Sequence, residues 1–133
     1  MEFKLHNGLN AKVEAAVTQD NTADSFGSGG VQVFATPMMI GLMEKAALSA
    51  VDPYLPCGYA TVGARLDIRH TAATPMGMKV YAAAELTEID GKRLVFKVEA
   101  YDEKEKIGEG CHERYIVNIQ RFMEKAADKV DKS

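Results

Sequence analysis

The feature that most constrains the fold is one helix that is apolar on almost all sides. The segment from Pro37 to about Val51 carries only two charged residues, Glu44 and Lys45. Thr36 is expected to begin this helix as its N-cap, because a hydroxyl just before a proline can satisfy free backbone N–H groups. A helix without a polar face must be buried on most of its surface. The rest of the chain is therefore expected to wrap around it.

After the helix, apolar and polar residues alternate with the period of an extended strand. In the segment Cys57–Ala72 this alternation puts one set of residues on the face toward the helix, namely Val62, Ala64, Leu66, Ile68 and His70. Three further strands are predicted over Lys79–Ile89, Lys92–Tyr101 and Ile107–Gln120, and a weaker one over Ala11–Thr18. A buried helix packed on an antiparallel meander of four long strands is an α+β arrangement.

The remaining segments are polar. Gln19–Gly30 is predicted to be a mobile loop, since its three glycines lower the cost of rearrangement. Arg121–Ser133 is predicted to be a short polar helix or tail. With no repeat or linker, residues 1–133 are expected to form one domain. So small a sheet leaves uncovered edges, which predicts a homodimer that joins two sheets.

Composition excludes several classes of function. Lys and Arg total 16 against 19 Asp and Glu, a net charge of −3, so neither nucleic acid nor an anionic membrane is an expected partner. Glycines interrupt the longest uncharged apolar stretch, Ser25–Met43, which argues against a membrane span. The start of the chain lacks the pattern of a signal peptide. Two cysteines make no disulfide framework, which predicts a reducing, cytoplasmic location.

Two ionisable residues interrupt these apolar patterns and are candidates for a catalytic role. Glu44 has apolar or small neighbours one turn away on each side, so a buried carboxylate that is protonated or paired is expected. His70 shares the strand face that should meet the helix, and the pair would suit acid–base chemistry. The structural alternatives are a Glu44 that reaches the surface beside Lys45 or a dimer contact, and a core histidine bonded to a backbone carbonyl.

Other candidates are weaker. Thr36 would already serve as an N-cap, worth about 1 kcal/mol, although it lies two turns before Glu44 and both could approach one cleft. Cys111 is expected to be a buried, inert strand thiol. Cys57, His6 and His112 add no metal-ligand spacing, so no metal site is predicted.

Three stretches of the sequence together resemble the hotdog-fold thioesterases, in the branch of the fluoroacetyl-CoA thioesterases. They are TPMMIGLMEKA, ATVGARLDIRHTAATPMGMKV and GEGCHERYIV, and the resemblance runs from about Ala11 to Gln120. Its most specific part is the spacing. A glutamate follows the threonine by eight residues, and a histidine follows a strand glycine by seven and precedes Ala-Thr-Pro closely.

The resemblance implies that Thr36, Glu44 and His70 form the catalytic group of an enzyme that hydrolyses a small acyl-CoA thioester. Glu44 would activate water or attack the carbonyl, His70 would supply the proton, and Thr36 would orient the carboxylate. Gly63 matches a glycine whose backbone lies near the thioester, and Arg114 an arginine that is structural or near the CoA end. In that family the site lies at a homodimer interface and needs neither metal nor organic cofactor.

One stretch departs from the family pattern. The fluoroacetyl-specific enzyme covers its pocket with phenylalanines in the loop before the helix, where this chain has Gly27–Gly30 and only Phe26 and Phe34 nearby. The sequence therefore does not identify the acyl group of the substrate. Two alternatives also stay open: a non-catalytic acyl-CoA binding module and a hotdog enoyl-CoA hydratase or dehydratase. The hydratase is disfavoured, because the helix lacks the expected Asp/His pair.

Overall fold

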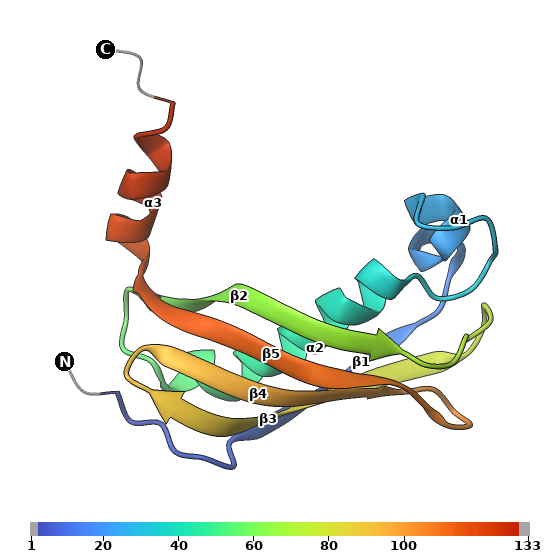
Figure 1. Ribbon diagram of the computed structural model, residues 1–133, viewed down its shortest axis with the longest axis horizontal. Helices are drawn as coiled ribbons and strands as arrows, with labels where there is room; N and C mark the ends of the chain where they lie inside the picture. The colour runs from blue at the N-terminus through green and yellow to red at the C-terminus, as the bar shows by residue number, and fades with distance from the viewer. Residues whose placement is uncertain (1–2, 131–133) are drawn as a thin grey trace.

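A long helix, α2 (Thr36–Val51), lies against one face of a five-stranded antiparallel sheet in the computed structural model, which describes residues 3–130 (Figure 1). The strands are β1 (Asn10–Ala16), β2 (Tyr59–His70), β3 (Lys79–Asp90), β4 (Arg93–Tyr101) and β5 (Lys106–Asn118). Met39 and Met43 of α2 are fully buried in the core with Leu94 and Phe96 of β4. The predicted α+β architecture is confirmed. The other side of α2 is exposed at Met38, Gly41 and Lys45.

The strand order is β1-β3-β4-β5-β2, so the predicted meander is correct only for β3, β4 and β5. β2 pairs with β5 and forms one edge of the sheet, while β1 pairs with β3 and forms the other. The connection from β2 to β3 is too long for a tight hairpin, so it does not oblige these strands to pair. Instead it crosses over and contacts the segment before α2, where the N–H of Phe34 donates to the carbonyl of Thr74 at 2.9 Å.

A β-bulge in the middle of β2 exchanges its two faces. The register against β5 shifts between Gly63 and Arg65, because one extra residue is inserted there. Gly63 lies opposite Arg114 and Leu66 lies opposite His112, and both partners are buried on the side of α2. The predicted helix-facing set is therefore right for Leu66, Ile68 and His70 and wrong for Val62 and Ala64, and Gly63 faces α2.

The segment before α2, predicted as a loop, contains two short helical elements. It contains a 3-10 turn (Gln19–Asn21) and the short helix α1 (Ala23–Phe26), capped by Thr18 and Thr22. The N-cap of α2 is Ala35, and Thr36 is the first helical residue. The prediction that Thr36 caps the helix is therefore wrong, and its hydroxyl is free for another contact.

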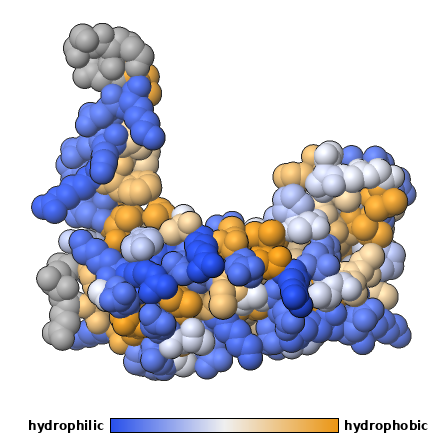
Figure 2. All heavy atoms as spheres, in the orientation of Figure 1, coloured by the Kyte–Doolittle hydropathy of each residue, from blue (hydrophilic) through white to orange (hydrophobic). Residues whose placement is uncertain are grey.

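The last helix, α3 (Ile119–Ala127), stands away from the sheet and extends past the edge formed by β2 (Figure 1). It begins two residues before the predicted terminal segment, so β5 ends at Asn118, and residues 131–133 of that segment lie outside the described residues. Its Phe122 and Met123 are exposed. In the space-filling view, α3 and the α1 region rise on either side of a wide notch above β2 (Figure 2).

Within residues 3–130, no helix has both the length and the apolar character needed to cross a membrane.

Candidate active site

The end of β2 and the start of α2 bring two of the predicted residues into contact. Thr36 Oγ1 and His70 Nδ1 are 2.7 Å apart, a short hydrogen bond. The other ring nitrogen of His70, Nε2, is buried and has no hydrogen-bond partner among the described residues. Burial lowers the pKa of His70 below its ordinary value, although the backbone of Ala72 opposes this shift. The imidazole is therefore neutral near pH 7 and able to accept a proton.

A pocket of about 360 Å³ opens beside this pair. Thr36 and His70 form part of its wall, and Phe34 contributes an apolar surface. Most other lining residues are small, among them Ala23, Ser28, Gly29, Ala72 and Ala73. Its size lies within the range of small-molecule sites, so it can admit a compact group next to the imidazole.

Glu44 lies about two turns further along α2 and faces a different part of β2. Its side chain is 37% exposed, and Oε2 lies 3.7 Å from Nη1 of Arg114. The predicted burial of this carboxylate is therefore wrong in degree, while the predicted pairing is correct. A Cβ added at Gly63 would come within 2.6 Å of Oε2 of Glu44. The carboxylate thus packs directly on the strand backbone, which only glycine permits.

Arg114 is held inside the protein by a closed set of hydrogen bonds. Its Nε donates to Thr61 Oγ1 at 2.8 Å, its Nη2 to the carbonyl of Thr61 at 2.9 Å, and its Nη1 contacts His112 Nε2 at 3.1 Å. Thr61 Oγ1 in turn donates to Asp52 Oδ1 at 2.7 Å, at the end of α2. Because the guanidinium is buried and fully engaged, the structural role is the one that this geometry supports for Arg114, rather than contact with CoA.

Contacts within one chain form two groups rather than one. Eight residues of helix separate Thr36 from Glu44 by about 12 Å, and seven residues of strand separate Gly63 from His70 by about 20 Å. One group therefore holds Glu44, Gly63 and Arg114 near the middle of β2, and the other holds Thr36 and His70 at its end. Both groups lie on the α2 side of the sheet, but the contacts described in one chain do not join them.

The cysteines lie outside both groups. Cys57 and Cys111 are free and exposed, so the predicted burial of Cys111 is wrong. It lies on the outer face of β5, where side chains are not covered by α2. In the described part of the chain, no cluster of three His, Cys, Asp or Glu residues is arranged to hold a metal ion.

Three members of the Arg114 network are not predicted from the sequence, namely Asp52, Thr61 and His112. Asp52 follows the helix end, and Thr61 lies on a strand face that the bulge reverses. In the sequence, His112 offers itself only as a metal ligand, and its spacing rejects that role. One signal was available, because His112 precedes Arg114 by two residues and two strand residues at that spacing share a face.

Known proteins share this fold and sequence pattern. Residues 17–120 match the family described as FlK, fluoroacetyl-CoA-specific thioesterase. The chain is 43% identical over 98 residues to the fluoroacetyl-CoA thioesterase of Streptantibioticus cattleyicolor, covering 74% of this chain and 70% of the relative. A structure of fluoroacetyl-CoA thioesterase FlK is similar with a TM-score of 0.87 at 34% identity, covering 94% of this chain and 97% of that one.

A hot-dog-like protein from Thermanaerovibrio acidaminovorans, 20% identical, has a TM-score of 0.86 and covers 96% of this chain and 94% of its own. The predicted hotdog fold, one sheet around one long helix, is thereby confirmed. The family match covers most of the chain and includes the whole of α2, β2, β3, β4 and β5. The chain therefore belongs to the fluoroacetyl-CoA-specific thioesterase family and is a thioester hydrolase.

Proposed function

We propose that this protein hydrolyses a small acyl-CoA thioester at a site shared between two identical subunits, with Thr36, Glu44 and His70 as its catalytic residues. The observation that carries the proposal is that these residues form two groups at different positions along the same edge strand, β2. A carboxylate and an imidazole that belong to one reaction must approach within hydrogen-bond or one-water reach. A second copy supplies that approach.

The free edge of β2 supports such a dimer. Among the described residues no strand pairs with this edge, and uncovered edges favour pairing with another chain. Antiparallel pairing of two β2 strands around a two-fold axis near Leu66 would put the Gly63 end of one strand beside the His70 end of the other. Leu66 is 41% exposed in the single chain. In this arrangement Glu44 of one subunit serves Thr36 and His70 of its partner.

The notch above β2, between α3 and the α1 region, also supports the dimer, because a second subunit could occupy it. α3 has no buried residue, although Ile119, Phe122 and Met123 give it an apolar side. A helix of only nine residues is marginally stable by itself in water. Since α3 extends past the free edge of β2 (Figure 1), a subunit paired along that edge would lie beside it and could cover its apolar side.

Each residue then has a definable task. Glu44 acts as general base for a water molecule, or attacks the thioester carbonyl itself to form an anhydride that water opens. Either attack produces a tetrahedral oxyanion, for which a backbone N–H near Gly63 is the proposed donor. Collapse breaks the carbon–sulfur bond. In the general-base route the proton that Glu44 takes from water passes through His70 to the departing CoA thiolate, and in the anhydride route the water that opens the anhydride supplies this proton. Thr36 fixes the orientation of the imidazole through the 2.7 Å contact.

The lining of the pocket beside His70 supports a substrate range of several small acyl groups, not fluoroacetyl alone. Phe34 is buried in its wall, while Phe26 is 52% exposed and is not among the lining residues. No aromatic ring therefore covers the pocket mouth in the described chain. We expect acetyl, propionyl and butyryl thioesters to be hydrolysed with similar kcat/KM, and fluoroacetyl-CoA not to be strongly preferred.

A screen of acyl-CoA thioesters of increasing length, with release of free thiol as the readout, tests the proposal. Glu44→Gln provides the matched control, since a binding module would keep its affinity for acyl-CoA and have no turnover to lose. Absence of hydrolysis across the whole series would contradict the proposal. A cytoplasmic location is part of it, because two exposed free thiols suit a reducing compartment.

A further inference from the structure

His112 is a fully buried residue of β5. It links Arg114, which faces Glu44, to the bulge of β2 at Arg65. Its Nε2 lies 3.1 Å from Arg114 Nη1, and its Nδ1 lies 2.9 Å from the carbonyl oxygen of Arg65. An arginine has no acceptor, so Nε2 must be the accepting nitrogen. The proton is therefore on Nδ1, which donates to Arg65. The two contacts together define one neutral tautomer.

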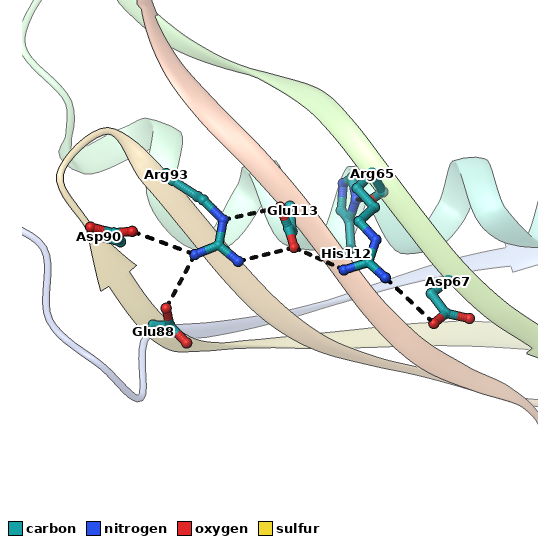
Figure 3. A network of polar contacts seen from close by, with 7 residues as sticks. All are labelled: Arg65, Asp67, Glu88, Asp90, Arg93, His112 and Glu113. Atoms are coloured by element: carbon teal, nitrogen blue, oxygen red, sulfur yellow. Dashed lines mark hydrogen bonds and ion pairs between the residues drawn. The ribbon is translucent and has the colours of Figure 1, made fainter.

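The contact with Arg65 anchors β2 at its bulge. Arg65 is the first residue after the register shift that turns Gly63 toward Glu44. On the opposite face of the sheet, the Arg65 side chain donates to Glu113 at 3.2 Å, and Arg93 holds that carboxylate through two more hydrogen bonds of 3.1 Å (Figure 3). The strand is thus fixed from both faces at the residue that determines how close Gly63 comes to the carboxylate.

The contact with Arg114 orients the group that faces Glu44. The same atom, Nη1, contacts His112 Nε2 and lies 3.7 Å from Glu44 Oε2. With one of its hydrogens directed at His112, the other is available to the carboxylate. Burial, reinforced by the charge of Arg114, lowers the pKa of His112, so the ring stays neutral and able to accept at neutral pH.

We propose that His112 is a positioning residue, which sets the orientation of the Glu44 carboxylate through Arg114 and holds the β2 bulge beside it. This inference rests on the proposed catalytic role of Glu44. It assigns His112 no contact with substrate, because the side chain is enclosed between the sheet and α2.

Replacing His112 by Phe keeps the ring volume but removes both hydrogen bonds, and replacing it by Gln keeps an acceptor for Arg114. We expect His112→Phe to lower kcat by roughly tenfold or more, since small misplacements of a catalytic group carry costs of this order. KM should change less than about threefold, because the substrate pocket lies at the other group. His112→Gln should recover most of kcat, and Cys111→Ser, on the outer face of the same strand, should change neither constant.

A double-variant cycle separates positioning from a general structural role. In an Arg114→Lys background, His112→Phe should have little further effect on kcat, because the two residues act in series. Multiplied losses, or a raised KM at unchanged kcat in folded protein, would overturn the inference. Nitrogen NMR of the wild type should find the His112 proton on Nδ1, and a proton on Nε2 would also overturn it. A failure of the proposed function itself would be seen separately, as full turnover in Glu44→Gln.

Discussion

The two groups at β2 differ in how firmly they are held. The carboxylate group is fixed by buried hydrogen bonds, with Arg114 joined to Thr61 and His112 before any substrate arrives. Within residues 3–130, the imidazole group has one side-chain hydrogen bond, between Thr36 and His70, and a pocket open beside it. The difference indicates a division of labour. In the proposed mechanism, one end of the strand preorganises a charge, which is the arrangement that favours catalysis, and the other end receives the acyl group.

The largest effect should come from the fixed end. Glu44→Gln keeps the shape of the side chain but removes its ability to take a proton or attack a carbonyl. We expect kcat to fall by roughly 10³-fold, within the range for a lost acid–base group, while the melting temperature stays close to that of wild type. Steady-state kinetics with acetyl-CoA and a thermal melt would check this. Near-normal turnover in a folded variant would remove Glu44 from the site.

A smaller loss is expected at the receiving end. His70→Ala should lower kcat by roughly 100-fold. Burial lowers the pKa of His70, so the imidazole of the wild type should be neutral and the enzyme active at pH 7. Activity should fall on the acid side, where the imidazole becomes protonated. A pH–rate profile of both proteins measures this. An acid limb that is the same in the wild type and in His70→Ala would contradict a proton-transfer role for His70.

The network behind the carboxylate should respond mainly in stability. Thr61→Val removes the hydroxyl that accepts from Arg114 Nε and donates to Asp52. Leaving buried partners unsatisfied costs about 1–3 kcal/mol in the free energy of unfolding, and kcat should fall only several-fold. Denaturant unfolding would measure the loss. Thr87→Val, which removes an exposed hydroxyl hydrogen bond of 3.1 Å to the carbonyl of Val95, is the matched control and should change the stability less.

The smallest effect concerns acid stability. In the folded state the pKa of His112 lies below the ordinary 6.5, so the unfolded chain binds the proton more readily. The stabilising contribution is then complete above pH 6.5 and is lost as pH falls through the folded pKa. We expect the melting temperature of His112→Gln to drop less between pH 7 and pH 5 than that of wild type. Equal drops in the two proteins would show that His112 is not a source of the acid sensitivity.

The elements of the fold could be predicted because their signals are local. An apolar surface on all sides identified α2, and a period of two located β2 to β5 within a few residues. Strand order and the bulge could not be predicted in this way, because they depend on which strands meet in space. One inserted residue reverses the faces of Val62 and Ala64 without leaving a mark on the alternation.

The same division holds for the site. Glu44 and His70 were identifiable because each interrupts an apolar pattern, and Thr36 because of its place before Pro37. Gly63 and Arg114 came from the family resemblance alone. The network joins Asp52 and Thr61, nine residues apart, to His112 and Arg114 of β5, and 53 residues separate Thr61 from Arg114. Apart from the two-residue spacing of His112 and Arg114, it depends on which segments meet in space.

Mixing two inactive variants tests the central claim, that Glu44 of one subunit serves His70 of the other. Glu44→Ala and His70→Ala proteins would be unfolded together, refolded and assayed, with each refolded alone as the control. In a shared site, half of the randomly assembled dimers regain one intact site of two, so about a quarter of the wild-type activity should return. If the three residues act within one chain, every site in the mixture lacks one of them. Activity no higher than that of the separate variants, in a mixture shown to contain the mixed dimer, would contradict the account.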